Sequence, residues 1–380
     1  MRQRLNQKML KTLLQVESIT DLSFPELVRL FREEESISDF LPEGTVQIDP
    51  RNGDSILYNS ARSKRPRDHR PELTSTMLEE SDCAICQGKT TGIIDVANLS
   101  QGFTFINKNL FPILYPMDDE TISEESGDKH HASGPGTRSA RGFHFLQWTS
   151  SYHDKDWYNM PLSDCAIVMK RLAALEKKLL LDAECLPPDT EQRGDQRAMQ
   201  NYVLIIKNYG RLVGASLIHG HQQIALSNIM PRRMIDNMDF ERDRSEPFSS
   251  YLCRENPPDL LVKDYGPAIL MVPYFMRRPY DMFLLVKDAS KKHLHELTEA
   301  EIIAVAEGWH DATRGIHKIL PEIGREVAYN VTTSNGPGTG LYFEFLPYSQ
   351  YFGGFEHLGL FVCQETPDRA ASRLRSLLSE

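Results

Sequence analysis

Two histidines separated by one glycine form the part of the chain whose residue types are best suited to chemistry. His219 and His221 flank Gly220, Gln223 follows two positions later, and an apolar run at 202–206 precedes them. Because side chains alternate along an extended strand, His219, His221 and Gln223 are expected on one face. That face could hold a metal ligand, a nucleophile and a hydrogen-bond donor. Ordinary polar histidines are the alternative in a chain with twelve.

The loop before this pair has the composition of a phosphate-binding loop. Gly214 and the small residues after it let backbone N–H groups approach an anion closely. Asn208 and Ser216 add short hydrogen-bonding side chains. The loop and the histidine pair together indicate a site for a phosphorylated ligand.

Residues 207–225 resemble the active-site segment of the galactose-1-phosphate uridylyltransferase family, the transferase branch of the histidine-triad superfamily. The family form is His-Pro-His-x-Gln, so Gly220 replaces the proline, and Gln223 keeps the glutamine that separates transferases from hydrolases. The motif Gly-Ala-Ser-x-x-His is also similar to that of ADP-sugar phosphorylases. The base of the nucleotide substrate is therefore left open between uridine, adenosine and guanosine. The residues that carry the resemblance are Asn208, Gly210, Gly214, Ser216, His219, Gly220, His221 and Gln223.

The resemblance implies nucleotidyl transfer from a nucleotide sugar through a covalent nucleotidyl-histidine, with His221 as nucleophile and Gln223 and Ser216 as supporting groups. The acceptor is a hexose 1-phosphate in a uridylyltransferase of galactose metabolism, or inorganic phosphate in an ADP- or GDP-sugar phosphorylase. A non-catalytic nucleotide-binding relative is the third reading. The intact His221 and Gln223 argue against it.

The chain is expected to have an α+β fold built as an internal duplication. Strand-like runs at 268–272, 282–286, 328–332 and 341–345 repeat the plan of the first half, and a capping box begins a helix at Thr298. The predicted units are a helical N-terminal extension (1–40) and two histidine-triad-like halves with antiparallel sheets flanked by helices (41–235 and 236–380). Tyr342 and Glu344 stand where the first half has its histidines, so the second copy is expected to be catalytically silent.

A basic loop after an Asn-Gly hairpin is the second candidate for binding phosphate. Residues 62–67 concentrate positive charge in an otherwise acidic chain, and a solvated loop is equally consistent with that spacing. The resemblance brings Arg62 and Arg65 to the nucleotide and places Asn107 and Asn109 against the ribose. Lys108 stands where the family often has an acid.

Cys83 and Cys86 form the CxxC pair of the chain. Half a zinc site, a redox pair and chance all fit a single CxxC, and no second one is present. The resemblance supplies His153 and His219 as the missing ligands, which gives one structural Zn²⁺ with a closed shell. His144 is expected to be packed or solvent-facing, and His130 with His131 to be a flexible polar pair.

Two further expectations follow from the resemblance. A second metal of some uridylyltransferases would use positions that fall on Tyr342 and Glu344, so that site is expected to be absent. Phe355 and Glu356 match a closing motif that reaches the sugar from the neighbouring subunit, so a homodimer is expected.

Composition limits the class of protein. The net charge of −10 argues against a nucleic-acid binder, and no apolar run approaches the roughly 20 residues that span a bilayer. The basic N-terminus lacks a secretory apolar core, and four of the six cysteines are scattered as single residues. These features predict a cytoplasmic protein that contacts neither nucleic acid nor membrane.

Overall fold

The computed structural model describes residues 4–65, 83–116, 137–182 and 201–379. Two sequence-based predictions lie outside these ranges: the basic loop beyond Arg65 and the His130–His131 pair. No helix in the described part of the chain is both long and apolar enough to cross a bilayer.

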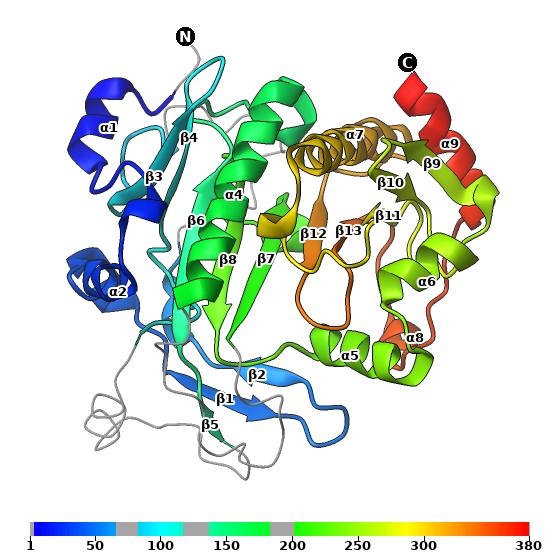
Figure 1. Ribbon diagram of the computed structural model, residues 1–380, viewed down its shortest axis with the longest axis horizontal. Helices are drawn as coiled ribbons and strands as arrows, with labels where there is room; N and C mark the ends of the chain where they lie inside the picture. The colour runs from blue at the N-terminus through cyan, green and yellow to red at the C-terminus, as the bar shows by residue number, and fades with distance from the viewer. Residues whose placement is uncertain (1–3, 66–82, 117–136, 183–200, 380) are drawn as a thin grey trace.

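A ten-stranded antiparallel sheet forms the centre of the molecule (Figure 1). Its strand order is β3-β4-β6-β8-β7-β12-β13-β11-β10-β9. Several strands, such as β11 with the sequence MFLLV, are buried along their whole length, which explains their continuous apolar sequence. The strands are β3 (Ile93–Asn98), β4 (Phe103–Lys108), β6 (Gly142–Trp148), β7 (Tyr202–Tyr209), β8 (His221–Ser227), β9 (Leu261–Asp264), β10 (Ala268–Met271), β11 (Met282–Val286), β12 (Tyr329–Ser334) and β13 (Tyr342–Pro347).

The strand order is palindromic about the pairing of β7 with β12. Reading outward from that pair, β8, β6, β4 and β3 on one side match β13, β11, β10 and β9 on the other. This order is compatible with the expected duplication of a five-stranded unit, which stays a proposal. The α+β class with antiparallel sheets is confirmed, and the division into units 1–40, 41–235 and 236–380 stays a proposal.

Two long helices cover one face of the sheet. In Figure 1 α4 (Leu162–Asp182) crosses in front of β6 and β8, and α7 (Glu299–Glu322) packs beside it. α7 begins at the predicted capping box, in which Glu301 N donates to Thr298 Oγ1 at 3.3 Å and Thr298 N donates to Glu301 Oε2 at 2.7 Å. Leu172, Trp309 and Phe343 belong to the main core that these helices share with the sheet.

Smaller elements surround this core. β1 (Thr45–Ile48) pairs with β2 (Ser55–Leu57) across the predicted hairpin and with β5 (Arg138–Ser139), forming a separate three-stranded sheet. On the second half, α9 contacts both α7 and β9. The shorter α-helices that follow β8 are α5 (Arg232–Arg244), α6 (Phe248–Glu255), α8 (Gly354–His357) and α9 (Pro367–Ser379).

The N-terminal residues are helical, as predicted, and pack on the outer edge of the first half. They contain α1 (Gln7–Leu13) and α2 (Phe24–Arg32), which lie beside β3 in Figure 1. Lys108 is fully buried, and its Nζ lies 2.7 Å from Oε2 of Glu34 and donates to the carbonyl of Leu30 at 3.1 Å. Because side chains alternate along β4, Lys108 points away from Asn107 and Asn109 and anchors the extension instead.

Candidate active site and metal centre

His221 is the first residue of β8 and lines a pocket on the sheet face opposite α4 and α7. Its buried ring packs beside Trp148 of β6, with 4.8 Å between the ring centroids. Nδ1 lies 2.8 Å from the carbonyl oxygen of His219 and donates its proton there. The lone pair of the neutral ring is therefore on Nε2.

The surroundings of His221 keep its ring uncharged. Burial lowers its pKa to about 4, the bond to the His219 carbonyl opposes this, and the charge of Lys207 adds to it. A neutral imidazole with one nitrogen held by an acceptor is the form that can act as a nucleophile.

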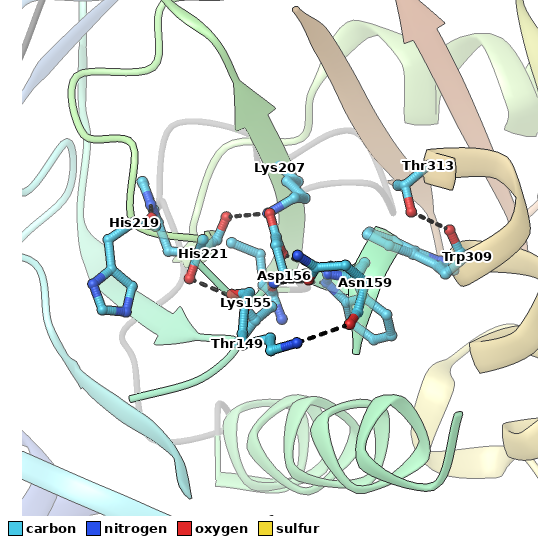
Figure 2. Close-up of polar contacts among 12 residues, drawn as sticks. Thr149, Lys155, Asp156, Asn159, Lys207, His219, His221, Trp309 and Thr313 are labelled. Carbon is cyan, nitrogen blue, oxygen red and sulfur yellow. Dashed lines mark hydrogen bonds and ion pairs between the residues drawn. The ribbon is translucent and has the colours of Figure 1, made fainter. Parts of the chain in front are cut away.

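A buried ion pair supports the start of β8. Lys207 Nζ lies 2.7 Å from Oδ2 of Asp156 and donates to the carbonyl of His221 at 3.1 Å, and both side chains of the ion pair are buried. Figure 2 shows Lys207 and Asp156 next to the backbone of His221. The pair therefore fixes the backbone of His221 to β7 and to the loop after β6.

Gly220, the residue that replaces the family's proline, fits a tightly packed position. A Cβ atom there would lie 2.6 Å from Oγ1 of Thr149 and 2.6 Å from Cγ of Asp156. The Gly220 carbonyl accepts hydrogen bonds from the backbone N of Thr149 at 3.0 Å and from its hydroxyl at 2.9 Å. Glycine at this position lets the loop with Asp156 approach the histidine pair.

The pocket beside His221 encloses about 700 Å³ of space, part of which is open solvent. Seven of the residues predicted from sequence line it, namely Arg62, Arg65, Asn107, Asn109, Ser216, His221 and Gln223. Segments more than 150 positions apart in the sequence thus converge on one cavity. The other lining residues are Ala84, Ile85, Lys89, Thr90, Leu110, Phe111, Leu146, Trp148 and Leu217.

The two arginines give the pocket a local positive charge in an acidic chain. Arg62 donates to the carbonyl of Phe111 at 2.5 Å, which holds its side chain in place. Burial and then the nearby charge of Arg65 lower the pKa of Arg62 to about 10. Both guanidinium groups remain charged at neutral pH, so an anion between them relieves their repulsion.

Cys83, Cys86, His153 and His219 come together as predicted. Their donor atoms all lie within 4.8 Å of one another, and the Cys86 Sγ to His219 Nδ1 distance is 3.6 Å. Zn–S and Zn–N bonds of about 2.3 and 2.0 Å in a tetrahedron require an S···N edge of roughly this length. The neighbouring Cys86, His153 and His219 lower the pKa of Cys83, which favours the thiolate that binds metal. The set therefore fits a structural Zn²⁺.

The ring of His219 is oriented for this role. Nε2 lies 2.8 Å from the carbonyl oxygen of Ser150, so Nε2 carries the proton and Nδ1 faces the cysteines. The carbonyl of the same residue accepts the proton of His221. The metal centre and the candidate nucleophile therefore share one residue.

The described residues contain a second group of potential metal ligands, which the sequence analysis missed. Glu176 of α4 lies near His293 and His295, at 3.0 Å from Nδ1 of His295, and also accepts a bond from Asn335 at 2.7 Å. It is separate from Tyr342 and Glu344, where the sequence analysis expected no second metal. Tyr342 donates to Asn237, and Glu344 pairs with Arg233.

Four predicted residues do not line the pocket. Asn208 accepts a bond from Asn330 across the β7–β12 pair at 2.7 Å, and Gly214, at φ +85°, ends the turn before Ser216. Phe355 is 63% exposed, and Glu356 accepts a bond from the backbone N of Gly353, so both lie on the surface in α8. Roles for these four in binding stay proposals.

Sequence reasoning missed the aromatic and imidazole groups that β6 supplies. Trp148 faces His221 in the β6–β8 register and donates to Oδ1 of Asn107 at 2.8 Å. His144, expected to be packed or solvent-facing, is packed, and its Nε2 lies 3.1 Å from Oε1 of Gln223. Alternation along this strand was the available signal, because His144 and Trp148 fall on the same face as Leu146.

Comparisons with known proteins agree with this geometry. No family model matches the chain. A solved structure of a uridylyltransferase aligns with a TM-score of 0.66 at 18% identity, covering 88% of this chain and 98% of that chain. The chain therefore has the fold of that uridylyltransferase structure, and the predicted resemblance is confirmed at the level of the fold.

One particular relative is recognised by both sequence and structure. ADP-glucose phosphorylase of Arabidopsis thaliana is 22% identical over 367 residues, which cover 90% of this chain and 95% of that protein. A structure of an ADP-glucose phosphorylase from Arabidopsis thaliana with bound ADP-glucose aligns with a TM-score of 0.59 at 17% identity, covering 87% of this chain and 97% of that one.

Removing one cysteine tests the metal centre. Cys83→Ser is expected to lose the zinc bound at the Cys₂His₂ group and to lower the thermal midpoint, because a structural metal contributes to folding stability. The measurement is zinc per chain by mass spectrometry together with a melting curve. Cys253→Ser, a free cysteine outside the group, is the control and should keep its zinc. Equal zinc content in the two variants would contradict the assignment.

Proposed function

We propose that the protein is a nucleotidyltransferase that moves a nucleoside monophosphate from a nucleotide sugar to a phosphorylated acceptor through a covalent intermediate on His221. The observation that carries this proposal is the state of His221 at the pocket wall. Its ring is neutral, its Nδ1 proton is held by a carbonyl, and its other nitrogen is available. The relatives described above are enzymes acting on nucleotides, which supports a transferase of this branch.

In the first half-reaction, Nε2 of His221 attacks the α-phosphorus of the donor. A P–N bond forms, the bond to the bridging oxygen breaks, and sugar 1-phosphate leaves with that electron pair. The ring becomes positively charged, and the bond from Nδ1 to the His219 carbonyl stabilises it. In the second half-reaction a phosphate oxygen of the acceptor attacks the same phosphorus and returns His221 to its neutral form.

The remaining pocket residues have roles that follow from charge and hydrogen bonding. Arg62 and Arg65 bind the diphosphate, Ser216 holds the leaving phosphate, and the Gln223 amide donates to a non-bridging oxygen of the transferred group. Asn107 and Asn109 lie where the ribose is expected. Cys83, Cys86, His153 and His219 would hold a zinc ion, which would tie the loop with His153 to His219, two residues before His221.

Two donors fit this chemistry. A UDP-hexose with a hexose 1-phosphate acceptor is the first candidate, because the segment 207–225 resembles that of the uridylyltransferase family. An ADP-sugar with inorganic phosphate as acceptor is the second candidate, and the sequence relationship to ADP-glucose phosphorylase favours it. Both require the same intermediate on His221 and differ in the base that the pocket selects.

A homodimer is part of the proposal. The segment 351–362 exposes a run of large apolar side chains, which marks an interaction surface rather than a monomer's exterior. A second copy of the chain is the proposed occupant, because the family motif with Phe355 and Glu356 lies in this segment. The exposed residues are Tyr351, Phe352, Phe355, Leu358, Leu360, Phe361 and Val362.

Mass spectrometry of the intact protein tests the intermediate. Separate incubation with UDP-glucose, ADP-glucose and a GDP-sugar is expected to add one nucleotidyl group, mapped by peptide analysis to His221. His221→Asn should give no adduct, whereas His310→Asn, outside the pocket, should react normally. A uridylyl adduct supports the first donor and an adenylyl or guanylyl adduct the second. No adduct with any donor would end the proposal.

The pH dependence of the first half-reaction tests the state of His221. Because the reactive ring is neutral and its pKa is about 4 instead of 6.5, the rate of adduct formation should stay flat down to about pH 5.5 and fall below it. The unfolded chain binds this proton more readily, so folding stability decreases as pH falls from 6.5 towards 4. Circular dichroism at each pH therefore checks that the protein is folded. A rate profile with its midpoint near pH 6.5 in folded protein would contradict the lowered pKa of His221.

Light scattering after size-exclusion chromatography tests the dimer. The protein is expected to elute with the mass of two chains, and Leu358→Glu with Leu360→Glu should shift it to one chain, because charges would be buried at the interface. Ile303→Glu changes an exposed apolar residue of α7 and serves as the control. An unaltered protein with the mass of one chain would refute the proposed dimer.

A further inference from the structure

We propose that His144 is a positioning residue that determines which end of the Gln223 amide faces the pocket. The inference rests on the proposed function, since it concerns the group that donates to the transferred phosphate. His144 does not line the pocket. It acts through Gln223.

The proton of His144 is placed by the backbone. The N–H of Ile113 donates to Nδ1 of His144 at 3.1 Å. A backbone N–H can only donate, so Nδ1 must be the unprotonated nitrogen and the proton of the neutral ring is on Nε2. The loop after β4 thereby selects the tautomer of a residue on β6.

This tautomer decides the orientation of Gln223. Nε2 of His144 lies 3.1 Å from Oε1 of Gln223, and because Nε2–H can only donate, the facing amide atom must be the oxygen. The NH₂ end of the amide is left for the pocket, which Gln223 lines. An amide turned by 180° would present its oxygen to an anionic phosphate and would repel it.

The sheet register makes the contact possible. His144 pairs with Ala225 and Leu146 with Gln223, so His144 and Gln223 are diagonal neighbours on the pocket face. Diagonal neighbours are within reach of side chains as long as histidine and glutamine. The contact therefore depends on the pairing of β6 with β8.

The surroundings keep His144 in this state. Its side chain is almost fully buried. The amide nitrogen of Asn109 lies 3.3 Å from Nδ1 and 3.2 Å from Nε2, so this donor contacts both ring nitrogens and does not itself select the tautomer, which the N–H of Ile113 sets. Burial and then the charges of Arg62 and Arg65 lower the pKa of His144 to about 3, with Gln223 opposing the shift. A neutral ring keeps one donor and one acceptor, so the orientation of Gln223 persists across neutral pH.

A double-mutant cycle tests whether His144 acts through Gln223. Removing one donor to a developing charge typically costs about 10²- to 10³-fold in rate, so Gln223→Ala is expected to slow adduct formation in that range. His144→Phe should slow it about 10- to 100-fold, with little change in donor KM. In the Gln223→Ala background, His144→Phe should cost less than about 2-fold. An equal loss in both backgrounds would mean a general structural role and would overturn the inference.

A conservative variant and a spectroscopic measurement complete the test. His144→Gln can accept from Ile113 and donate to Gln223, so it should restore the rate to within about 5-fold of the unaltered protein. Nitrogen-15 NMR of the imidazoles should show His144 protonated on Nε2, identified by the signal that His144→Phe removes. A proton on Nδ1, an unaffected rate in His144→Phe, or no rescue in His144→Gln would overturn the inference.

These outcomes are distinct from a failure of the proposed function. If the unaltered protein forms no adduct with any donor, the nucleotidyltransferase proposal fails. The tautomer measured in ligand-free protein still reports whether His144 fixes the Gln223 amide. If the unaltered protein forms the adduct and the cycle shows no coupling, the positioning role alone fails.

Discussion

The ion pair between Lys207 and Asp156 holds the candidate site together. Two buried charges are costly unless they are paired and hydrogen-bonded, and here the ammonium also binds the carbonyl of His221. Asp156 lies in the same loop as Ser150 and His153, which orient or belong to the metal group. One pair of side chains therefore joins β7, the start of β8 at His221 and the loop that carries His153.

The candidate site around His221 lies in the first half of the palindromic sheet. β8 and β13 occupy matching places, yet β13 presents Tyr342 and Glu344 where the first half presents its histidines. Burial raises the pKa of Glu344, and Arg233, Arg277 and Arg278 oppose the shift. The second half thus keeps the same strand order, and Tyr342 and Glu344 form internal contacts there. This fits a structural role for the second half.

Sequence predicted the strands and the histidine motif from local patterns, whereas the resemblance to a known family supplied the rest of the site. Apolar runs gave β11 and β13, and the motif around His221 gave Ser216, His221 and Gln223. The other predicted lining residues and the histidine ligands came from the resemblance alone. The tautomer of His144 could not be predicted, because it depends on a backbone N–H from another loop and on strand register. Glu176 lies more than 100 positions from His293 and His295 in the sequence, so no local pattern links them. Alternation could place Lys108 on the face opposite Asn107, but its partner Glu34 lies in a distant segment that no local pattern identifies.

The buried position of Lys108 changes how the first 40 residues are understood. Its ammonium lies in a dry interior only because Glu34 and the carbonyl of Leu30 surround it. A chain that begins at residue 41 would leave that cation without these partners. In the sequence, Lys108 stands between Asn107 and Asn109, which line the pocket. The helical extension is therefore part of the packing of the first half, and its loss would disturb the strand that carries Asn107 at the pocket.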